Sequence, residues 1–122
     1  MAIHNQLGVD GEQLALNHLI DKGYIIKEHN WRCGKLEIDI IARKDKELVF
    51  VEVKSRRDIE YAHPSDAIDD KKMRNLISAA DVYIKKFNIP FDIRFDVISV
   101  IVNGTHTTIE HIEDAFFPPI WR

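Results

Sequence analysis

Two apolar, strand-like runs in this chain contain charged side chains that a buried strand does not favour. Residues 36–41 include Asp39, and residues 48–54 include Glu52 and Lys54. Because side chains alternate between the two faces of a strand, Glu52 and Lys54 share one face, and Asp39 is expected on the face opposite Ile38 and Ile40. Burying a carboxylate costs several kcal/mol unless a cation or a metal compensates it. An acid, a hairpin and then Glu-x-Lys therefore indicate a metal-dependent site that cleaves phosphodiesters.

Asp39 and Glu52 are the candidate ligands of the metal, and the carbonyl of Val53 is a candidate third oxygen. Mg²⁺ prefers oxygen ligands and keeps several waters, so one or two carboxylates are sufficient. Lys54 is the candidate catalytic lysine, because it can orient or deprotonate the attacking water or stabilise the pentavalent phosphate. The alternative is a hairpin with one solvent-exposed face, on which Glu52 and Lys54 form an ordinary ion pair.

Two further charged residues lie on apolar faces of predicted helices. Glu12 shares a face with Ala15, Leu16 and Leu19, so we expect it to turn toward the sheet and join the acidic cluster. A carboxylate near a helix N-terminus is also favoured without any function. Lys72 lies on the apolar stripe of the second helix, where it either extends past the core or reaches a phosphate or the carboxylates.

The remaining polar residues of interest divide into basic and structural ones. Arg56 and Arg57 directly follow the Glu-x-Lys strand and are, with Lys72, the candidate phosphate contacts, although such basic runs are often ordinary solvated surface. Asp96 lies inside another strand-like run, and we expect it to pair with a buried cation. His111, in the last predicted strand, is expected to be a satisfied structural histidine.

The predicted elements place these residues on one sheet. Apolar residues at helical spacing predict helices over residues 5–22 and about 64–87. Strands are predicted from residue 24 into a turn at 30–34, and over 36–42, 47–54, 93–102 and 107–112. This α-β-β-β-α-β-β order indicates one α/β domain over residues 1–122, with a central mixed β-sheet flanked by helices. The long connection through the second helix predicts that strand 93–102 is parallel to its neighbour.

Composition restricts the class of protein. The chain has 122 residues, of which 45% are hydrophobic and 30% charged, as expected for one soluble domain. No apolar run approaches the roughly 18–20 residues of a membrane span, so we expect no membrane association. Cys33 is the single cysteine, which excludes an internal disulfide and suits a cytoplasmic protein. With a net charge of −3, nucleic-acid binding would depend on a local positive surface.

Over nearly its whole length the sequence resembles the YraN-like family of uncharacterised bacterial proteins. The residues that carry the resemblance are Gly11-Glu12 with Ala15 and Leu19, Gly23-Tyr24, Asn30 with Arg32, residues 37–41, residues 49–54 with Arg56, Lys72 with Leu76 and Ala80, residues 94–97, and Ala115-Phe116. That family is predicted to share the restriction-endonuclease-like PD-(D/E)XK fold and to be related to archaeal Holliday-junction resolvases. Departures include Leu36, where the family usually has glycine, and Ile38, where the fold has proline.

The resemblance implies a restriction-endonuclease-like core with a metal-dependent nuclease site. In that site Glu12, Asp39 and Glu52 are the acids, Lys54 is the catalytic lysine and Lys72 is an auxiliary basic residue. We therefore expect a Mg²⁺- or Mn²⁺-dependent endonuclease that hydrolyses phosphodiester bonds in DNA. Branched or junction DNA is the substrate suggested by analogy, and cutting both strands of a junction would require a homodimer.

Two other functions fit the sequence. A nucleic-acid-binding module could keep the fold without cleaving, although binding alone would not need Asp39 and Glu52 clustered near a phosphate. A protein-interaction adaptor would dock on its partner through the apolar tail, residues 115–122. Cleavage with Mn²⁺ distinguishes the nuclease from both alternatives.

Overall fold

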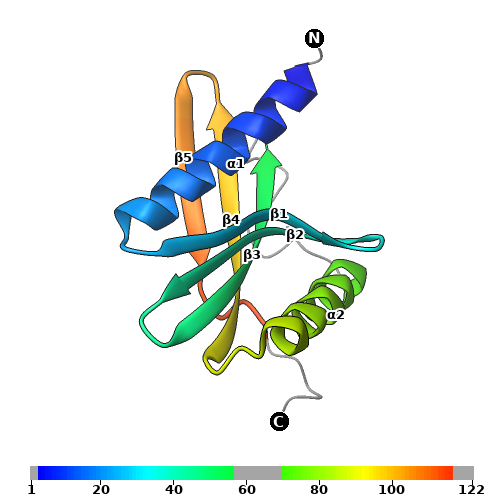
Figure 1. Cartoon of the computed structure of the whole chain (residues 1–122). Helices are drawn as coiled ribbons and strands as arrows, with labels where there is room; N and C mark the ends of the chain where they lie inside the picture. Colours follow the sequence, from blue (N-terminus) through cyan, green and yellow to red (C-terminus); the bar gives the residue numbers. More distant parts are fainter. Residues whose placement is uncertain (1–2, 57–69, 117–122) are drawn as a thin grey trace.

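The computed structural model describes residues 3–56 and 70–116, with side chains from Gly11 onward (Figure 1). Its elements are α1 (Ile3–Asp21), β1 (Ile25–Cys33), β2 (Leu36–Lys44), β3 (Glu47–Arg56), α2 (Asp70–Phe87), β4 (Asp92–Asn103) and β5 (His106–Ile112). The predicted α/β class and the order α-β-β-β-α-β-β are confirmed. The predicted start of the second helix near residue 64 lies outside the described residues.

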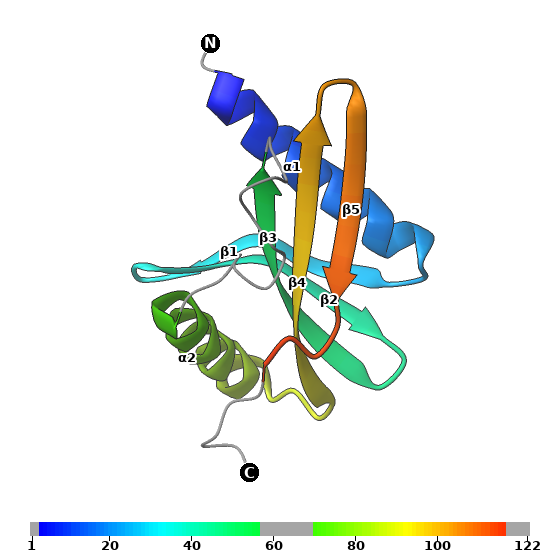
Figure 2. The ribbon, with the colours of Figure 1, turned by 180° about the vertical axis from the view of Figure 1, so that it is seen from behind.

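The strands form one five-stranded mixed sheet in the order β1-β2-β3-β4-β5. Neighbours are antiparallel except β3 and β4, which are parallel from Glu47 to Arg56, as the sequence predicts. A parallel pair requires a crossover connection, and α2 is part of it. Figures 1 and 2 show α1 across one face of the sheet and α2 below the β1–β2 hairpin. Within the described residues, neither helix is long and apolar enough to cross a membrane.

Alternation along β3 divides the core between the two faces of the sheet. Val49 and Val51 pack on the side of α1, whereas Leu48 and Phe50 pack on the side of α2. The buried residues that the helices contribute are Ala15, Leu16 and Leu19 from α1, and Leu76, Ala79, Ala80 and Tyr83 from α2. Each set lies at helical spacing and forms one stripe. The central strand is therefore covered on both sides, which explains its nearly continuous apolar sequence.

Strand β1 is longer than the sequence predicts. A turn is expected at residues 30–34, but the strand continues to Cys33 and the chain reverses only at Gly34. Asn30 has a φ of 54° inside the strand. Asparagine tolerates the left-handed region as a single residue, so this turn-forming residue marks an irregularity in β1 rather than its end.

Gly11 allows α1 to approach β3 closely. A Cβ atom at this position would lie 1.9 Å from Oγ and 3.1 Å from Cβ of Ser55. Alanine would gain about 1 kcal/mol of helix propensity, but overpacking typically costs about 1–3 kcal/mol. We expect Gly11→Ala to lower the free energy of unfolding, measured by urea denaturation, by about 1 kcal/mol.

Ser55→Gly supplies the control, because it removes both atoms that the new methyl group would meet. In that background, Gly11→Ala should become neutral or stabilising, and the double-mutant cycle isolates the pairwise effect from the cost of glycine in a strand. An equal loss in both backgrounds would contradict the close approach of α1 to β3.

Candidate active site

The candidate site lies where β2 separates from β3. Their pairing ends at Ile40 and Val51, although β2 stays paired with β1 as far as Leu36 and β3 with β4 as far as Arg56. Strand β2 therefore leaves β3 and follows β1 into the hairpin that projects over α2 in Figure 1. Beyond this point, the backbone groups that β2 and β3 would have shared need other partners.

Asp39 supplies one of these partners, because its Oδ2 accepts a hydrogen bond of 2.8 Å from the amide of Val53. Its carboxylate thus bridges the two separating strands. Ile38 belongs to the core on the side of α2 and Ile40 to the core on the side of α1. The prediction that these two isoleucines share a face is therefore wrong, because the alternation breaks at Asp39. The register places the irregular Asn30 of β1 directly opposite.

A pocket of about 190 Å³ opens between β2, β3 and the first turns of α2. Its lining residues are Lys35, Leu36, Glu37, Asp39, Glu52, Lys72, Asn75 and Leu76. The structure thus brings Asp39, Glu52 and Lys72 together, from two strands and a helix. Because one water occupies roughly 30 Å³ of liquid volume, the pocket has room for a phosphoryl group and a few waters.

The two carboxylates of the pocket are compensated differently. Loss of solvation, and then repulsion from Glu52, raises the pKa of Asp39 to about 7, with a smaller repulsion from Glu12. The side chain of Glu52 is 10% exposed, and Nζ of Lys72 lies 2.8 Å from its Oε2. The negative charge of Asp39 is removed by protonation, and that of Glu52 is compensated by the ammonium group of Lys72. The pocket therefore does not hold two uncompensated negative charges.

Glu12 lies beside the pocket rather than in its lining. Its Oε2 is 3.2 Å from Nε2 of His29 on β1, and the side chains of these two residues are 28% and 41% exposed, respectively. The predicted helix face does turn toward the sheet, and Glu12 is near enough to influence the pKa of Asp39. Its direct partner, however, is a histidine that sequence reasoning did not consider.

Lys54 and Arg56 follow Glu52 at two-residue spacing on β3, and both are half-buried. Among the described residues, Lys54 forms no ion pair, and the buried Nε of Arg56 has no hydrogen-bond partner. Arg57, the other predicted phosphate contact on this segment, lies outside the described residues. The strand thus presents an acid followed by two cations that no described carboxylate neutralises.

The sequence model of a family described as "Uncharacterised protein family UPF0102" matches residues 11–100 of the chain. The chain belongs to the UPF0102 family. A UPF0102 protein of Phocaeicola vulgatus is 49% identical over 121 residues, which span 99% of this chain and 100% of the relative. A UPF0102 protein of Bacteroides thetaiotaomicron is 46% identical with the same coverage. One from Flavobacterium psychrophilum is 44% identical over 117 residues, or 96% of this chain and 98% of the relative. The resemblance to the YraN-like family is thereby confirmed.

The pocket of this UPF0102 protein includes residues that sequence reasoning did not assign to a site. Asn75 lies one helical turn after Lys72, so helical spacing was a usable signal for it. Glu37 precedes Asp39 by two residues in the same strand. Lys35 comes from the hairpin turn, and its place at the pocket depends on the separation of β2 from β3, for which no local sequence signal exists.

The donor atoms of the pocket fit a hard divalent cation. No three His, Cys, Asp or Glu side chains among the described residues are arranged to hold a metal by themselves. Asp39 and Glu52 offer carboxylate oxygens, and Mg²⁺ or Mn²⁺ complete their coordination with water and substrate phosphate oxygens. The UPF0102 pocket therefore suits a metal held jointly by protein, water and substrate.

Binding of Mn²⁺ to this pocket is expected to weaken below pH 7. The metal requires an ionised carboxylate, and the pKa of Asp39 is raised to about 7, so protons compete with it below that pH. We expect the affinity to fall by about tenfold per pH unit below about pH 7, and to change little above about pH 8. Isothermal titration calorimetry at several pH values measures this. Constant affinity from about pH 5.5 upward would contradict the raised pKa.

Proposed function

We propose that this protein is a Mg²⁺- or Mn²⁺-dependent nuclease that hydrolyses phosphodiester bonds in DNA. One observation carries the proposal: Asp39 and Glu52 line a single pocket at the point where β2 leaves β3. Two acids placed together in a partly buried site destabilise a fold, and such groups concentrate at functional sites. Lys54 follows Glu52 by two residues on β3, so both side chains lie on the same face of the strand.

Asp39, Glu52 and Lys72 of the pocket lining, and Val53 and Lys54 next to Glu52 on β3, would each have a role in phosphodiester hydrolysis. When bound, the metal would polarise the phosphoryl oxygen and lower the pKa of a water. Asp39 and Glu52 would hold it through their carboxylates, and the amide of Val53 fixes the orientation of Asp39. Lys54 would orient the attacking water or stabilise the charge that develops on the phosphate. Lys72, on the opposite wall, would contact a phosphate oxygen.

Around this centre, Arg56 and Arg57 are the proposed contacts to neighbouring phosphates, and Glu12 tunes the charge of the acidic pair. Among the described residues no carboxylate pairs with Arg56 and its buried Nε has no hydrogen-bond partner, so its charge is available to a phosphate that reaches the rest of the guanidinium. Branched or junction DNA is the substrate proposed by analogy with the fold, and it would be cut by a homodimer.

The test is cleavage of labelled junction, flap, duplex and single-stranded DNA in the presence of Mn²⁺. Wild-type protein should cleave at least one of these substrates. Lys54→Met keeps the length of the side chain and removes its charge. We expect it to lower the cleavage rate by about 100-fold or more, while Mn²⁺ binding stays within about twofold.

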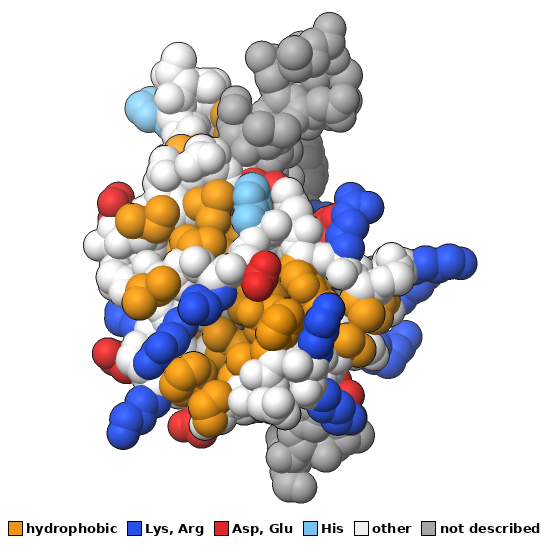
Figure 3. All heavy atoms as spheres, in the orientation of Figure 1, with side chains coloured by type: hydrophobic (Ala, Val, Ile, Leu, Met, Phe, Trp, Pro, Cys, Tyr) orange, Lys and Arg blue, Asp and Glu red, His pale blue; other side chains and the backbone are white. Residues whose placement is uncertain are grey.

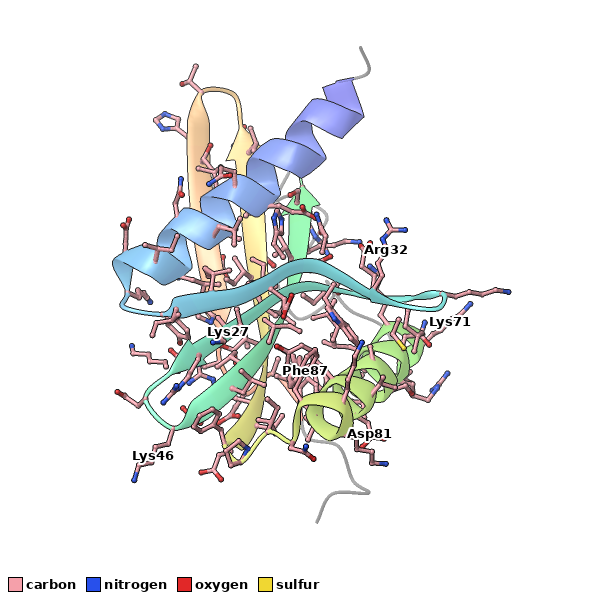
Figure 4. All side chains as sticks on the ribbon, viewed as in Figure 1. Lys27, Arg32, Lys46, Lys71, Asp81 and Phe87 are labelled. Carbon is pink, nitrogen blue, oxygen red and sulfur yellow. The ribbon has the colours of Figure 1, made fainter. Side chains whose placement is uncertain are left out.

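Lys27→Met is the matched control, because Lys27 is an exposed lysine of β1 that does not line the pocket and that Figure 4 shows far from Lys71. Its cleavage rate should equal that of the wild type. If wild-type protein cleaves no substrate with either Mg²⁺ or Mn²⁺, the nuclease proposal is wrong.

A further inference from the structure

Exposed cations stand on both sides of the pocket mouth. We call them the cationic rim: Arg32 and Lys35 on the β1–β2 hairpin, and Lys71 in the first turn of α2. Lys35 itself lines the pocket, as does Lys72, the neighbour of Lys71. Figure 4 shows Arg32 and Lys71 at the same side of the molecule, where the hairpin projects beside the start of α2. The carboxylates of Asp39 and Glu52 therefore lie between cations of the hairpin and cations of α2.

This rim is not a consequence of a basic chain, because the net charge of the protein is −3. In Figure 3, Lys and Arg side chains predominate along the right-hand edge, over the hairpin tip and α2, whereas both signs alternate along the left edge. Among the described residues, the exposed acids that adjoin the rim in sequence are Glu37 and Asp70. In the part of the chain that the structure describes, positive charge is thus concentrated at the mouth of the pocket, although the whole chain has a net charge of −3.

Among the described residues, one ion pair lies on the rim, and it does not prevent the rim from binding an anion. Nε of Arg32 lies 2.9 Å from Oε2 of Glu37, but the two side chains are 76% and 37% exposed. Ion pairs exposed to this extent contribute about 0–1 kcal/mol and are screened by salt. A phosphate can therefore compete for the guanidinium of Arg32 at little cost.

We propose that the hairpin tip and the first turns of α2 form a two-sided clamp that binds the phosphate backbone of one nucleic-acid strand across the pocket. The inference rests on the proposed function, because the pocket between the walls must take a phosphodiester. A pocket of about 190 Å³ accepts one phosphoryl group. The two neighbouring phosphates of the same strand then lie on opposite sides of the pocket, one near Lys35 and the other near Lys71. A chain of evenly spaced anions matches this arrangement of charge.

The experiment compares two double variants with the same loss of charge. Lys35→Gln with Lys71→Gln removes one cation from each wall. Lys27→Gln with Lys46→Gln removes two exposed lysines that Figure 4 places away from the rim. Affinity for a fluorescent single-stranded oligonucleotide is measured by anisotropy in EDTA over a range of salt concentrations. Each lost phosphate contact lowers the slope of log K against log salt by about 0.7, so we expect a decrease of about 1.4 in the rim variant.

The control variant should keep the slope of the wild type. An unchanged slope in the rim variant, or an equal decrease in both variants, would overturn the clamp. Displacement of the oligonucleotide by poly-glutamate at equal charge concentration would also overturn it, because the site would then accept any polyanion. Cleavage is measured separately with Mn²⁺. If the rim variant has a decreased salt slope but the wild type cleaves no DNA, the clamp proposal stands and the nuclease proposal is wrong. If the wild type cleaves DNA but the slope of the rim variant is unchanged, the nuclease proposal stands and the clamp proposal is wrong.

Discussion

Asp39→Asn is expected to stabilise the metal-free protein and to abolish the proposed nuclease activity. Burial raises the pKa of Asp39 from 3.8 to about 7, so the folded state binds more protons than the unfolded state between these values. Stability linked to this group is therefore complete below about pH 4 and lost as the pH rises to about 7. At pH 8 the wild-type protein holds a carboxylate that its surroundings disfavour.

Asparagine removes that charge while its Oδ1 can still accept the hydrogen bond from Val53. A shift of three pKa units corresponds to roughly 4 kcal/mol at most, and we expect a gain of about 2 kcal/mol because local relaxation moderates the penalty. Urea denaturation in EDTA at pH 5 and pH 8 measures it, and the gain should be larger at pH 8. Cleavage with Mn²⁺ should fall by about a thousandfold or more, which is roughly 4 kcal/mol of lost transition-state stabilisation.

Asp45→Asn is the matched control for this prediction. Asp45 lies in the exposed turn between β2 and β3 with a φ of 53°, a conformation that asparagine also tolerates. Its stability should change by less than about 0.5 kcal/mol, and its cleavage rate should not change. A stability gain at Asp39 that is the same at pH 5 and pH 8 would show that the charge is not its source.

Local periodicity explains how much of this fold is predictable from the sequence. The apolar run of β3 with its interruption at Glu52, and the helical spacing around Leu19 and Leu76, identify the elements and their order. The length of the connection between β3 and β4 then predicts their parallel pairing. Glu52 and Asp39 could be selected as candidates because a charge inside a buried run conflicts with its neighbours, and that conflict is visible in one strand at a time.

The separation of β2 from β3 was not predictable in this way. It results from competition for partners: β2 stays with β1, and β3 stays with β4, although the two belong to one hairpin. The hydrogen bond from Val53 to Asp39 and the place of Lys35 at the pocket follow from this competition. A regular alternation was expected for Ile38 and Ile40, and it fails because pairing across the sheet overrides the local pattern.

A second large effect is expected at Asp96, which lies on the α1 side of the sheet and has no part in the pocket. Its carboxylate is fully buried and accepts hydrogen bonds of 2.9 and 2.8 Å from Nε and Nη2 of Arg94. Nε2 of His111 lies 2.6 Å from its Oδ2, and the amide of Asp114 donates to its Oδ1. The predictions of a buried cation beside Asp96 and of a satisfied structural histidine are thus confirmed.

These contacts shift the pKa of Asp96 in the direction opposite to that of Asp39. Although burial alone would raise the pKa of Asp96, hydrogen bonds from His111 and Arg94 hold it below its usual range. Asp96→Ala removes the buried partner of Arg94, whose side chain is 7% exposed. Its other carboxylate neighbours, Glu47 and Glu113, are 43% and 55% exposed. Breaking such a pair from one side costs about 3–5 kcal/mol, and we expect a loss of about 3 kcal/mol in urea denaturation at pH 7.

Replacing both partners separates the cost of an unpaired charge from the worth of the pair. Arg94→Met with Asp96→Leu should lose far less stability than Asp96→Ala alone, because no buried charge is left without its partner. An equal loss in both proteins would mean that the network contributes through its shape rather than through charge. Any variant that folds should keep the cleavage rate of the wild type, because this network and the pocket occupy opposite faces of the sheet. We expect loss of charge to stabilise the protein at Asp39 and to destabilise it at Asp96. That difference in sign would distinguish an acid with the proposed chemical role from an acid that serves the fold.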